Sequence, residues 1–190
     1  MEILMGNHLT KPESDIFFDI YLNLLDYVNS RYRIIPDAGR FADRKNTDHY
    51  KMIQVALHIW INHPELLTEY LSGTPEMSQK KQSILRSWRR FVYRKLVIVR
   101  HLPSGSVVAE YDNPDRLYLV HGVTQSLEEL TEKNEIPVQL ATTLLPFEGR
   151  IITDGLLAID EKGTDEKYTP DYCKEIYQQA RLNGTILTEL

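Results

Sequence analysis

Thr142-Thr-Leu-Leu-Pro-Phe-Glu-Gly-Arg-Ile-Ile-Thr-Asp-Gly-Leu-Leu157 is the stretch of the chain with the most explicit local signals. Two apolar pairs, Leu144–Leu145 and Ile151–Ile152, flank a short polar segment. Within that segment Pro146 fixes a backbone angle suited to a turn, and Gly149 can adopt the positive φ that a bulged hairpin requires. The stretch therefore predicts a β-hairpin.

Upstream of this hairpin, the sequence after Lys95 alternates between apolar, β-branched runs and turn residues, which is typical of short antiparallel strands. The predicted strands are Leu96–Val99, Ser106–Tyr111, Leu117–Val123, Val138–Leu145 and Arg150–Ile159. A capping box at Ser126–Glu129 predicts a short helix between the third and fourth strands, ending near Asn134. Asp154-Gly155 inside the last strand indicates a bulge.

The rest of the chain has helical periodicity. The predicted helices are Ser14–Asn29 with Ser14 as N-cap, Thr47–Ile61, a short one from Pro64 to Gly73, Ser78–Arg94 and Pro170–Leu182. In the fourth helix Trp88 and its apolar neighbours form a core stripe, which places Arg86, Arg89 and Arg90 on the opposite side.

Together these elements predict an α+β protein. We expect a helical N-terminal region over 1–95, an antiparallel β region over 96–160, and a polar linker with a C-terminal helix over 161–190. The alternative is that all three form one compact domain. Because short antiparallel strands curl to hide their edges, the sheet is expected to be a small, partly open five-stranded barrel.

Composition excludes several classes of protein. The 190 residues are 42% hydrophobic and 26% charged, as in ordinary globular chains, which argues against disorder or a coiled coil. A single cysteine, Cys173, excludes an intramolecular disulfide and a multi-cysteine metal cage. Neither a signal peptide nor a membrane-spanning run is evident, so we expect a cytoplasmic protein that does not contact a membrane.

Four segments resemble a group of uncharacterised bacterial proteins. These segments are Arg100–Ser106, Tyr118–Val123, Ser126–Glu129 and Thr142–Leu157, and the last is similar to a terminal segment LLPF-x-G-x-II-x-DGLL in that group. The similarity covers roughly residues 90 to 160 and departs from the pattern at Thr153, where the group has an aromatic residue. It implies a bacterial origin and similar strand boundaries, and it carries no activity, cofactor or site residue.

Charge is distributed unevenly along the chain. The net charge is −5, yet residues 77–109 hold eight basic and no acidic residues between two acidic flanks. Six of these cations form a candidate anion-binding face, namely Lys80, Lys81, Arg86, Arg89, Arg90 and Arg94. Such a face can hold phosphates in a salt-sensitive manner. The favoured alternative is that acidic segments fold over it and neutralise it.

Arg100, His101 and Asp154 form a second candidate, a polar site at the strand bulge. This site requires the first and last strands to be neighbours, as barrel closure would favour. The favoured alternative is an ion pair that only fixes strand register.

Familiar catalytic and metal-binding patterns are missing from the sequence. His49, His58 and His63 are spaced by nine and five positions, which predicts that they do not share a helix face, so no metal site is expected. No catalytic residue and no cofactor is predicted, because neither a nucleophile motif nor a phosphate-binding loop occurs. Whether the protein is an enzyme stays open.

These observations favour a non-enzymatic binding or interaction module whose partner is unidentified and is another protein or nucleic acid. The first alternative is a nucleic-acid or polyanion binder that uses the basic helix 78–95. The second is a hydrolase of unknown substrate with a concave site around His101 and Asp154.

Overall fold

A computed structural model describes residues 6–43, 48–131, 136–160 and 166–190 and divides the chain into two compact units. The helical unit is Lys11–Phe91, and the barrel unit is Val92–Leu190 together with the N-terminal segment that ends at Thr10. The predicted helix boundaries at Thr47 and Asn134 and the linker residues 161–165 lie outside the described residues.

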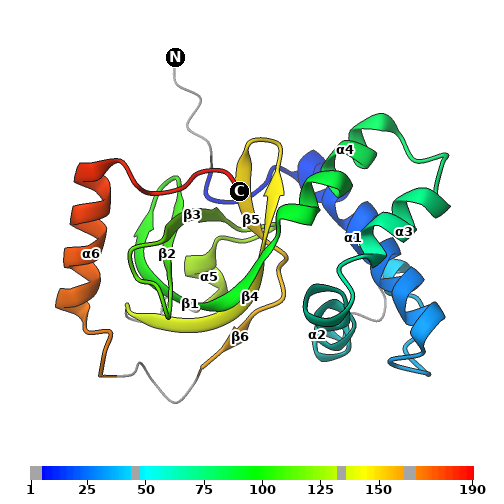
Figure 1. Cartoon of the computed structure of the whole chain (residues 1–190), viewed down its shortest axis with the longest axis horizontal. Helices are drawn as coiled ribbons and strands as arrows, with labels where there is room; N and C mark the ends of the chain where they lie inside the picture. Colours follow the sequence, from blue (N-terminus) through cyan, green and yellow to red (C-terminus); the bar gives the residue numbers. More distant parts are fainter. Residues whose placement is uncertain (1–5, 44–47, 132–135, 161–165) are drawn as a thin grey trace. The chain divides into compact units, whose positions relative to one another are not determined.

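Seven helical segments make up the described part of the helical unit, and Figure 1 labels α1 to α4 among them. They are α1 (Lys11–Tyr32), the 3-10 turn η1 (Phe41–Asp43), α2 (His49–Leu57), the π-helical turn η2 (His58–Asn62), α3 (Leu66–Gly73) and α4 (Gln79–Ser87), which continues as the 3-10 turn η3 (Trp88–Arg90). The fully buried Trp88 packs against Phe17 and Tyr21 of α1 at ring-centroid distances of 5.7 and 5.9 Å. This aromatic cluster anchors the apolar faces of α1 and α4.

Helix α1 begins three residues before the predicted N-cap. Ser14 is buried inside the helix, where its hydroxyl donates to the carbonyl of Lys11 at 3.0 Å. The prediction of Ser14 as N-cap was wrong because Pro12, which suits the first turn of a helix, lies upstream of it.

The fourth helix is shorter than predicted. It ends at Ser87, passes through η3 and gives way to strand β1 (Val92–Leu102). Arg94 therefore lies on a strand of the barrel unit and not on the basic helix, so its inclusion in the helical arginine set was wrong. β-branched Val92 and the aromatic Tyr93 favour the extended conformation over the helix.

Five strands of the barrel unit close on themselves. β1 pairs with β2 (Gly105–Glu110) and with β4 (Val138–Phe147), and β5 (Arg150–Thr153) joins β4 to β3 (Leu117–His121). The predicted barrel is confirmed, but the sheet is mixed and not purely antiparallel, since β3 and β5 run parallel. The strand order, with helix α5 (Leu127–Leu130) between β3 and β4, is that of five-stranded Greek-key barrels of the OB type.

The predicted hairpin connects β4 and β5, and its turn lies two residues beyond Pro146. Glu148 and Gly149 both have positive φ, 47° and 78°, as the central residues of a type I′ turn do. Pro146 is part of the strand and lies opposite Ile151, next to the turn-flanking pair Phe147 and Arg150. In an antiparallel ladder, hydrogen-bonded pairs alternate with pairs that are not hydrogen-bonded, and the Pro146–Ile151 pair is of the second kind. The missing N–H of proline therefore removes no hydrogen bond between β4 and β5.

Asp154 and Gly155 interrupt the last strand more strongly than predicted. Thr153 pairs with Leu144, whereas Ala158 in β6 (Ala158–Ile159) pairs with Ala141 of the same partner strand. Extra residues are therefore accommodated around Gly155, whose φ is 80°. The segment predicted as one strand is two, both antiparallel to β4.

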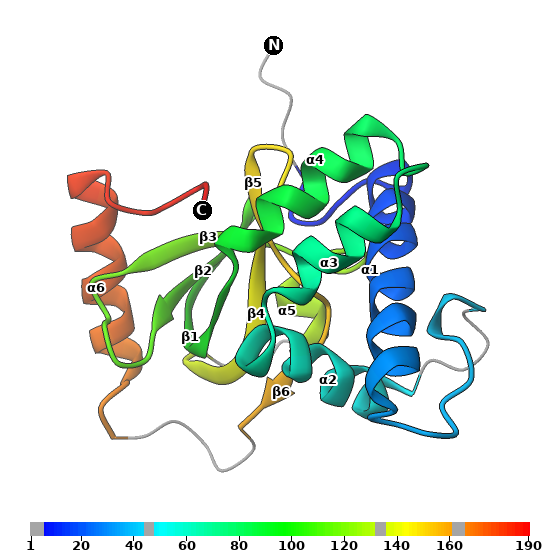
Figure 2. The same ribbon diagram turned by 45° about the vertical axis from the view of Figure 1, so that its right-hand side comes forward.

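The C-terminal helix α6 (Pro170–Asn183) covers the outer face of the barrel beside β1 and β2 (Figure 2). Its buried Cys173, Ile176 and Ala180 pack on the outward-facing Val97 and Val107. Because the inward-facing residues fill the barrel core, β1 is buried on both faces over Leu96–Val99. After α6 the chain pairs with β3 through two hydrogen bonds of Leu187 to Leu117 and Leu119, at 2.9 and 2.8 Å.

Candidate functional site

The exposed arginines of α4 and η3 form one face of the helical unit. Arg86, Arg89 and Arg90 are exposed, while Ile84 and Trp88 of the same segment are buried. We refer to Arg86, Arg89 and Arg90 as the arginine face. The apolar stripe of the sequence predicted this exposure, because it directs the arginines away from the α1 packing surface.

Two members of the arginine face donate to neutral groups. Arg86 donates to the side-chain amide oxygen of Gln82 at 2.9 Å, and Arg89 donates to the hydroxyl of Thr68 on α3 at 2.7 Å. Lys81 of α4 differs, since it forms an ion pair with Asp19 of α1 at 2.6 Å. The Arg86 and Arg89 guanidinium groups thus keep their charge and further N–H donors available.

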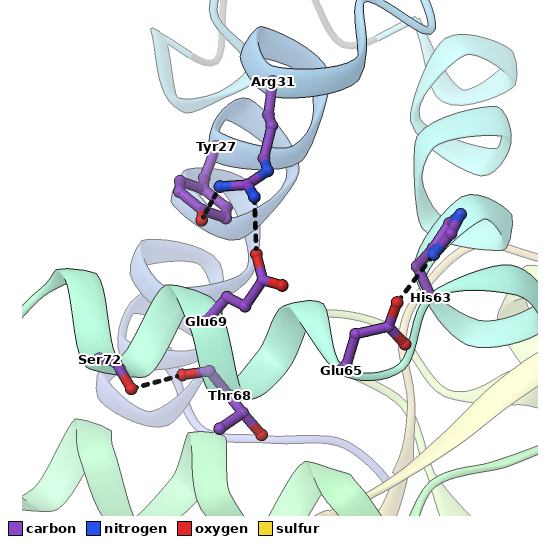
Figure 3. A network of polar contacts seen from close by, with 7 residues as sticks. All are labelled: Tyr27, Arg31, His63, Glu65, Thr68, Glu69 and Ser72. Atoms are coloured by element: carbon purple, nitrogen blue, oxygen red, sulfur yellow. Dashed lines mark hydrogen bonds and ion pairs between the residues drawn. The ribbon is translucent and has the colours of Figure 1, made fainter.

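The neighbouring acid on α3 is engaged elsewhere. Figure 3 shows Glu69 turned toward Arg31 of α1, with 3.2 Å between the paired atoms, while Arg31 also donates to the hydroxyl of Tyr27. On the same helix, Thr68 lies beside Ser72, whose hydroxyl donates to its carbonyl at 2.9 Å. Thr68 therefore positions Arg89 without neutralising it.

The predicted polar site of Arg100, His101 and Asp154 rests on a premise that the structure contradicts. β4 separates β1 from β5, so the first and last barrel strands are not neighbours. Arg100 lies over the ring of Tyr177 on α6 at 5.9 Å, and the His101 ring contacts the hydroxyl of Ser106 at 2.7 Å. Arg100 and His101 therefore have partners other than Asp154.

Asp154 belongs to a buried network of its own. Its carboxylate accepts from the Leu156 N–H at 3.0 Å and from the Thr142 hydroxyl at 3.1 Å, and the Thr142 and Thr153 hydroxyls are 2.7 Å apart. Asp154 is 4% exposed and Thr153 fully buried. These contacts hold the break between β5 and β6, which is a structural role for the Asp-Gly pair.

The outer face of β2 and β3, which OB barrels use for oligonucleotides and oligosaccharides, is occupied in this chain. Val107 and Leu117 on that face pack under α6 with Tyr168, whose hydroxyl donates to the carbonyl of Tyr111 at 2.7 Å. This face is therefore covered by α6 and Tyr168, and fold does not imply function.

His58 and His63, which the sequence spacing predicts to lie on different helix faces, are in contact in the structure. The π-helical turn η2 closes with a backbone bond from His63 N–H to the His58 carbonyl at 3.0 Å, and the two rings are 4.6 Å apart. The prediction that this spacing gives no shared face was wrong for this pair, because a π turn brings positions five apart into line. Within the described residues, no group of three or more His, Cys, Asp or Glu side chains is placed to hold a metal ion.

A cleft in the helical unit was missed by sequence reasoning. Its walls are the polar face of α1, the loop after α1 and the connection from α3 to α4, and its volume is 1110 Å³. The signal that was available is the polar spacing of Asp19, Asn23 and Asp26 along α1.

Comparisons with protein-family models, with curated proteins and with solved structures found no match for this chain. In the described residues no helix has both the length and the apolar character needed to cross a bilayer.

Proposed function

We propose that this protein is a non-enzymatic binding module and that its arginine face binds the phosphate groups of nucleic acid. The observation that carries the proposal is that Arg86 and Arg89 are exposed and that their hydrogen bonds, to Gln82 and Thr68, go to neutral side chains. Arginine is suited to phosphate because its planar donors can form two parallel hydrogen bonds to one anion.

The chemistry implies binding without sequence preference. Three arginines on a helix exterior contact backbone phosphates and carry no base information. With about three phosphates neutralised, the affinity for duplex DNA should fall about 40-fold between 50 and 200 mM salt. The net charge of −5 opposes association, so the interaction is expected to be weak.

The test is a fluorescence-anisotropy titration of labelled single-stranded and double-stranded DNA at several salt concentrations. The triple variant R86E/R89E/R90E should lose binding, whereas a control with the same charge change, K167E/K174E/R181E near and on α6, should retain more of it. Neither triple removes a buried side chain, and circular dichroism verifies folding.

Two results would overturn the proposal. One is the absence of binding at the lowest salt, which would leave the arginine face as a surface for an acidic protein partner. The other is equal loss in both triple variants, which would mean that only net charge matters.

A further inference from the structure

The cleft in the helical unit has the dimensions of a ligand site. At 1110 Å³ it matches or exceeds the volumes of about 300 to 1,000 Å³ typical of small-molecule pockets. It is lined by mixed polar and apolar groups, including Ile20 and Tyr27 of α1, Tyr70 of α3 and Met77 before α4. All of its walls belong to one compact unit.

One wall of the cleft, the loop after α1, is fixed in place by side chains of that helix. Asn29 makes a two-point contact with Ile35, donating to its carbonyl at 3.0 Å and accepting from its N–H at 2.8 Å. Asp26 accepts from the N–H groups of Phe41 and Ala42 at 2.7 and 3.1 Å. The wall is therefore preorganised, which lowers the entropy cost of binding.

Six charged side chains line the cleft, and four of them are paired with each other. Lys81 pairs with Asp19 at 2.6 Å, and Arg40 pairs with Asp26 at 3.8 Å. The remaining two are Arg33 on the loop and Glu76 on the α3–α4 connection. Both are exposed, and over the described ranges neither side chain has a hydrogen bond or an ion pair.

Arg33 occupies a backbone conformation that favours glycine. Its φ is 49°, and its N–H caps α1 by donating to the Asn29 carbonyl at 2.8 Å. Helices often end on such a left-handed residue, which is usually glycine because a Cβ is strained there. A charged side chain at this lip of the cleft, held at a cost in strain, points to a use for the guanidinium.

Three carboxylates influence Tyr70 on the α3 side of the cleft. Burial, followed by the carboxylates of Asp19, Asp26 and Glu76, raises the pKa of Tyr70 to about 12. The ring of Tyr70 also packs on Tyr27, with centroids 5.2 Å apart, and gives this end an aromatic floor. A cationic group is favoured there by the Glu76 carboxylate, since Asp19 and Asp26 are already paired, and by the aromatic faces.

From this separation of charge we infer that the cleft binds a short peptide in its zwitterionic form. The C-terminal carboxylate of the peptide lies on Arg33, and its ammonium group lies by Glu76 and Tyr70. Neither end of the peptide has to displace a partner from the two ion pairs of the cleft, Lys81–Asp19 and Arg40–Asp26. The inference concerns a different site from the arginine face and does not rest on the proposed function.

The experiment measures the melting temperature of the full chain with each of the twenty Ala-Xaa dipeptides at about 10 mM, a concentration that stabilises measurably if Kd is millimolar. At least one free dipeptide should raise the melting temperature by a few degrees. The N-acetylated and C-amidated forms of the same dipeptide should not. Free amino acids serve as a further arm, because they carry the same two charges at shorter spacing.

Arg33→Gly separates a ligand role from a structural one, because it removes the guanidinium and also relieves the strained φ. The variant should melt at the same or a higher temperature without peptide and should lose the response to it. Glu148→Gly is the matched control, since Glu148 has φ 47° but lies in the barrel hairpin, and it should keep the full response. Glu76→Gln should weaken binding of the free dipeptide.

The inference is overturned if no free dipeptide shifts the melting temperature. It is equally overturned if capped and free dipeptides act alike, or if Arg33→Gly responds like the unaltered chain. Loss of nucleic-acid binding in the arginine-face variant leaves this result unchanged, so the two proposals fail separately.

Discussion

His58 and His63 lie with their ring centroids 4.6 Å apart, and the ring of Tyr32 contacts both, at 4.7 and 5.5 Å. His63 is also 2.8 Å from the Glu65 carboxylate (Figure 3), so the two imidazoles have different surroundings. Burial and then the neighbouring His63 lower the pKa of His58 below its ordinary 6.5. The hydrogen bond from His63 is the main cause that lowers the pKa of Glu65 below 4.5.

These shifts predict that the helical unit is destabilised by mild acid. A lowered pKa at His58 means that the folded chain binds the proton more weakly than the unfolded chain. Stability therefore decreases as the pH falls from about 6.5 toward the lower pKa of the folded state. Glu65 adds a stabilising contribution that is present above pH 4.5 and is lost as the pH falls through its lowered pKa. Thermal melts between pH 3 and 8 measure both.

His58→Phe is the variant that isolates the first effect, since it keeps a ring against Tyr32 and removes the titrating group. Its melting temperature should change less between pH 7 and pH 5.5 than that of the unaltered chain. His49→Phe, at an exposed position of α2, is the control and should leave the pH profile as it was. A profile in His58→Phe identical to that of the unaltered chain would contradict the assignment.

Gly122 and Gly73 should respond oppositely to alanine. A Cβ at Gly122 would lie 1.6 Å from the Gln125 carbonyl oxygen, and the Gly122 backbone also bonds to Asn7 and Leu9. Gly122→Ala must shift the backbone before α5, so we expect a loss of about 3 kcal/mol or more in urea unfolding. Gly73 has no heavy atom within 4 Å of such a Cβ, and Gly73→Ala should change stability by less than about 1 kcal/mol, toward stabilisation. Equal effects would refute this account.

Asp154→Ala tests whether the Asp-Gly pair is structural. The substitution leaves the Leu156 N–H and the Thr142 hydroxyl without their shared carboxylate acceptor inside the barrel. We expect the free energy of unfolding to fall by about 2 kcal/mol, as for other buried groups that lose a partner. Asp160→Ala is the control, because its ion pair with Lys95 is 3.8 Å long and exposed, and such pairs contribute less than about 1 kcal/mol. A neutral Asp154→Ala would require another role for the motif.

Much of the barrel was predictable because its signals are local. The capping box at Ser126 and Glu129 forms as predicted, with the Ser126 N–H donating to Glu129 at 2.8 Å. The hairpin strands pair across Gly149, and the C-terminal helix begins at Pro170 as its N1 residue. Turn and cap residues act on their immediate neighbours, so their effect does not depend on the rest of the fold.

Sequence reasoning could not predict the contacts that depend on which elements pack together in the fold. The parallel contact of β3 with β5 joins Val120 to Ile151, and no pattern within either strand reveals that choice of partner. The same holds for the cleft, whose walls at Arg33 and Glu76 are brought together by the packing of α1 against α3 and α4. The His58–His63 contact was missed because periodicity assumes a regular α-helix, and η2 is a π turn.

Cys173 provides a probe of how firmly α6 covers the barrel. The thiol is 1% exposed, and burial raises its pKa from 9.0 to about 11, so near pH 8 about 100-fold fewer thiolates form than in the unfolded chain. Labelling with a chromogenic disulfide reagent should therefore be at least about 100-fold slower in the native protein than in urea. Ile176→Asp places a charge against the outer barrel face and should accelerate native labelling, whereas Lys174→Asp, on the exposed side of α6, should not. Native labelling within about tenfold of the unfolded rate would mean that α6 opens readily and that the outer face of β2 and β3 is accessible to ligands after all.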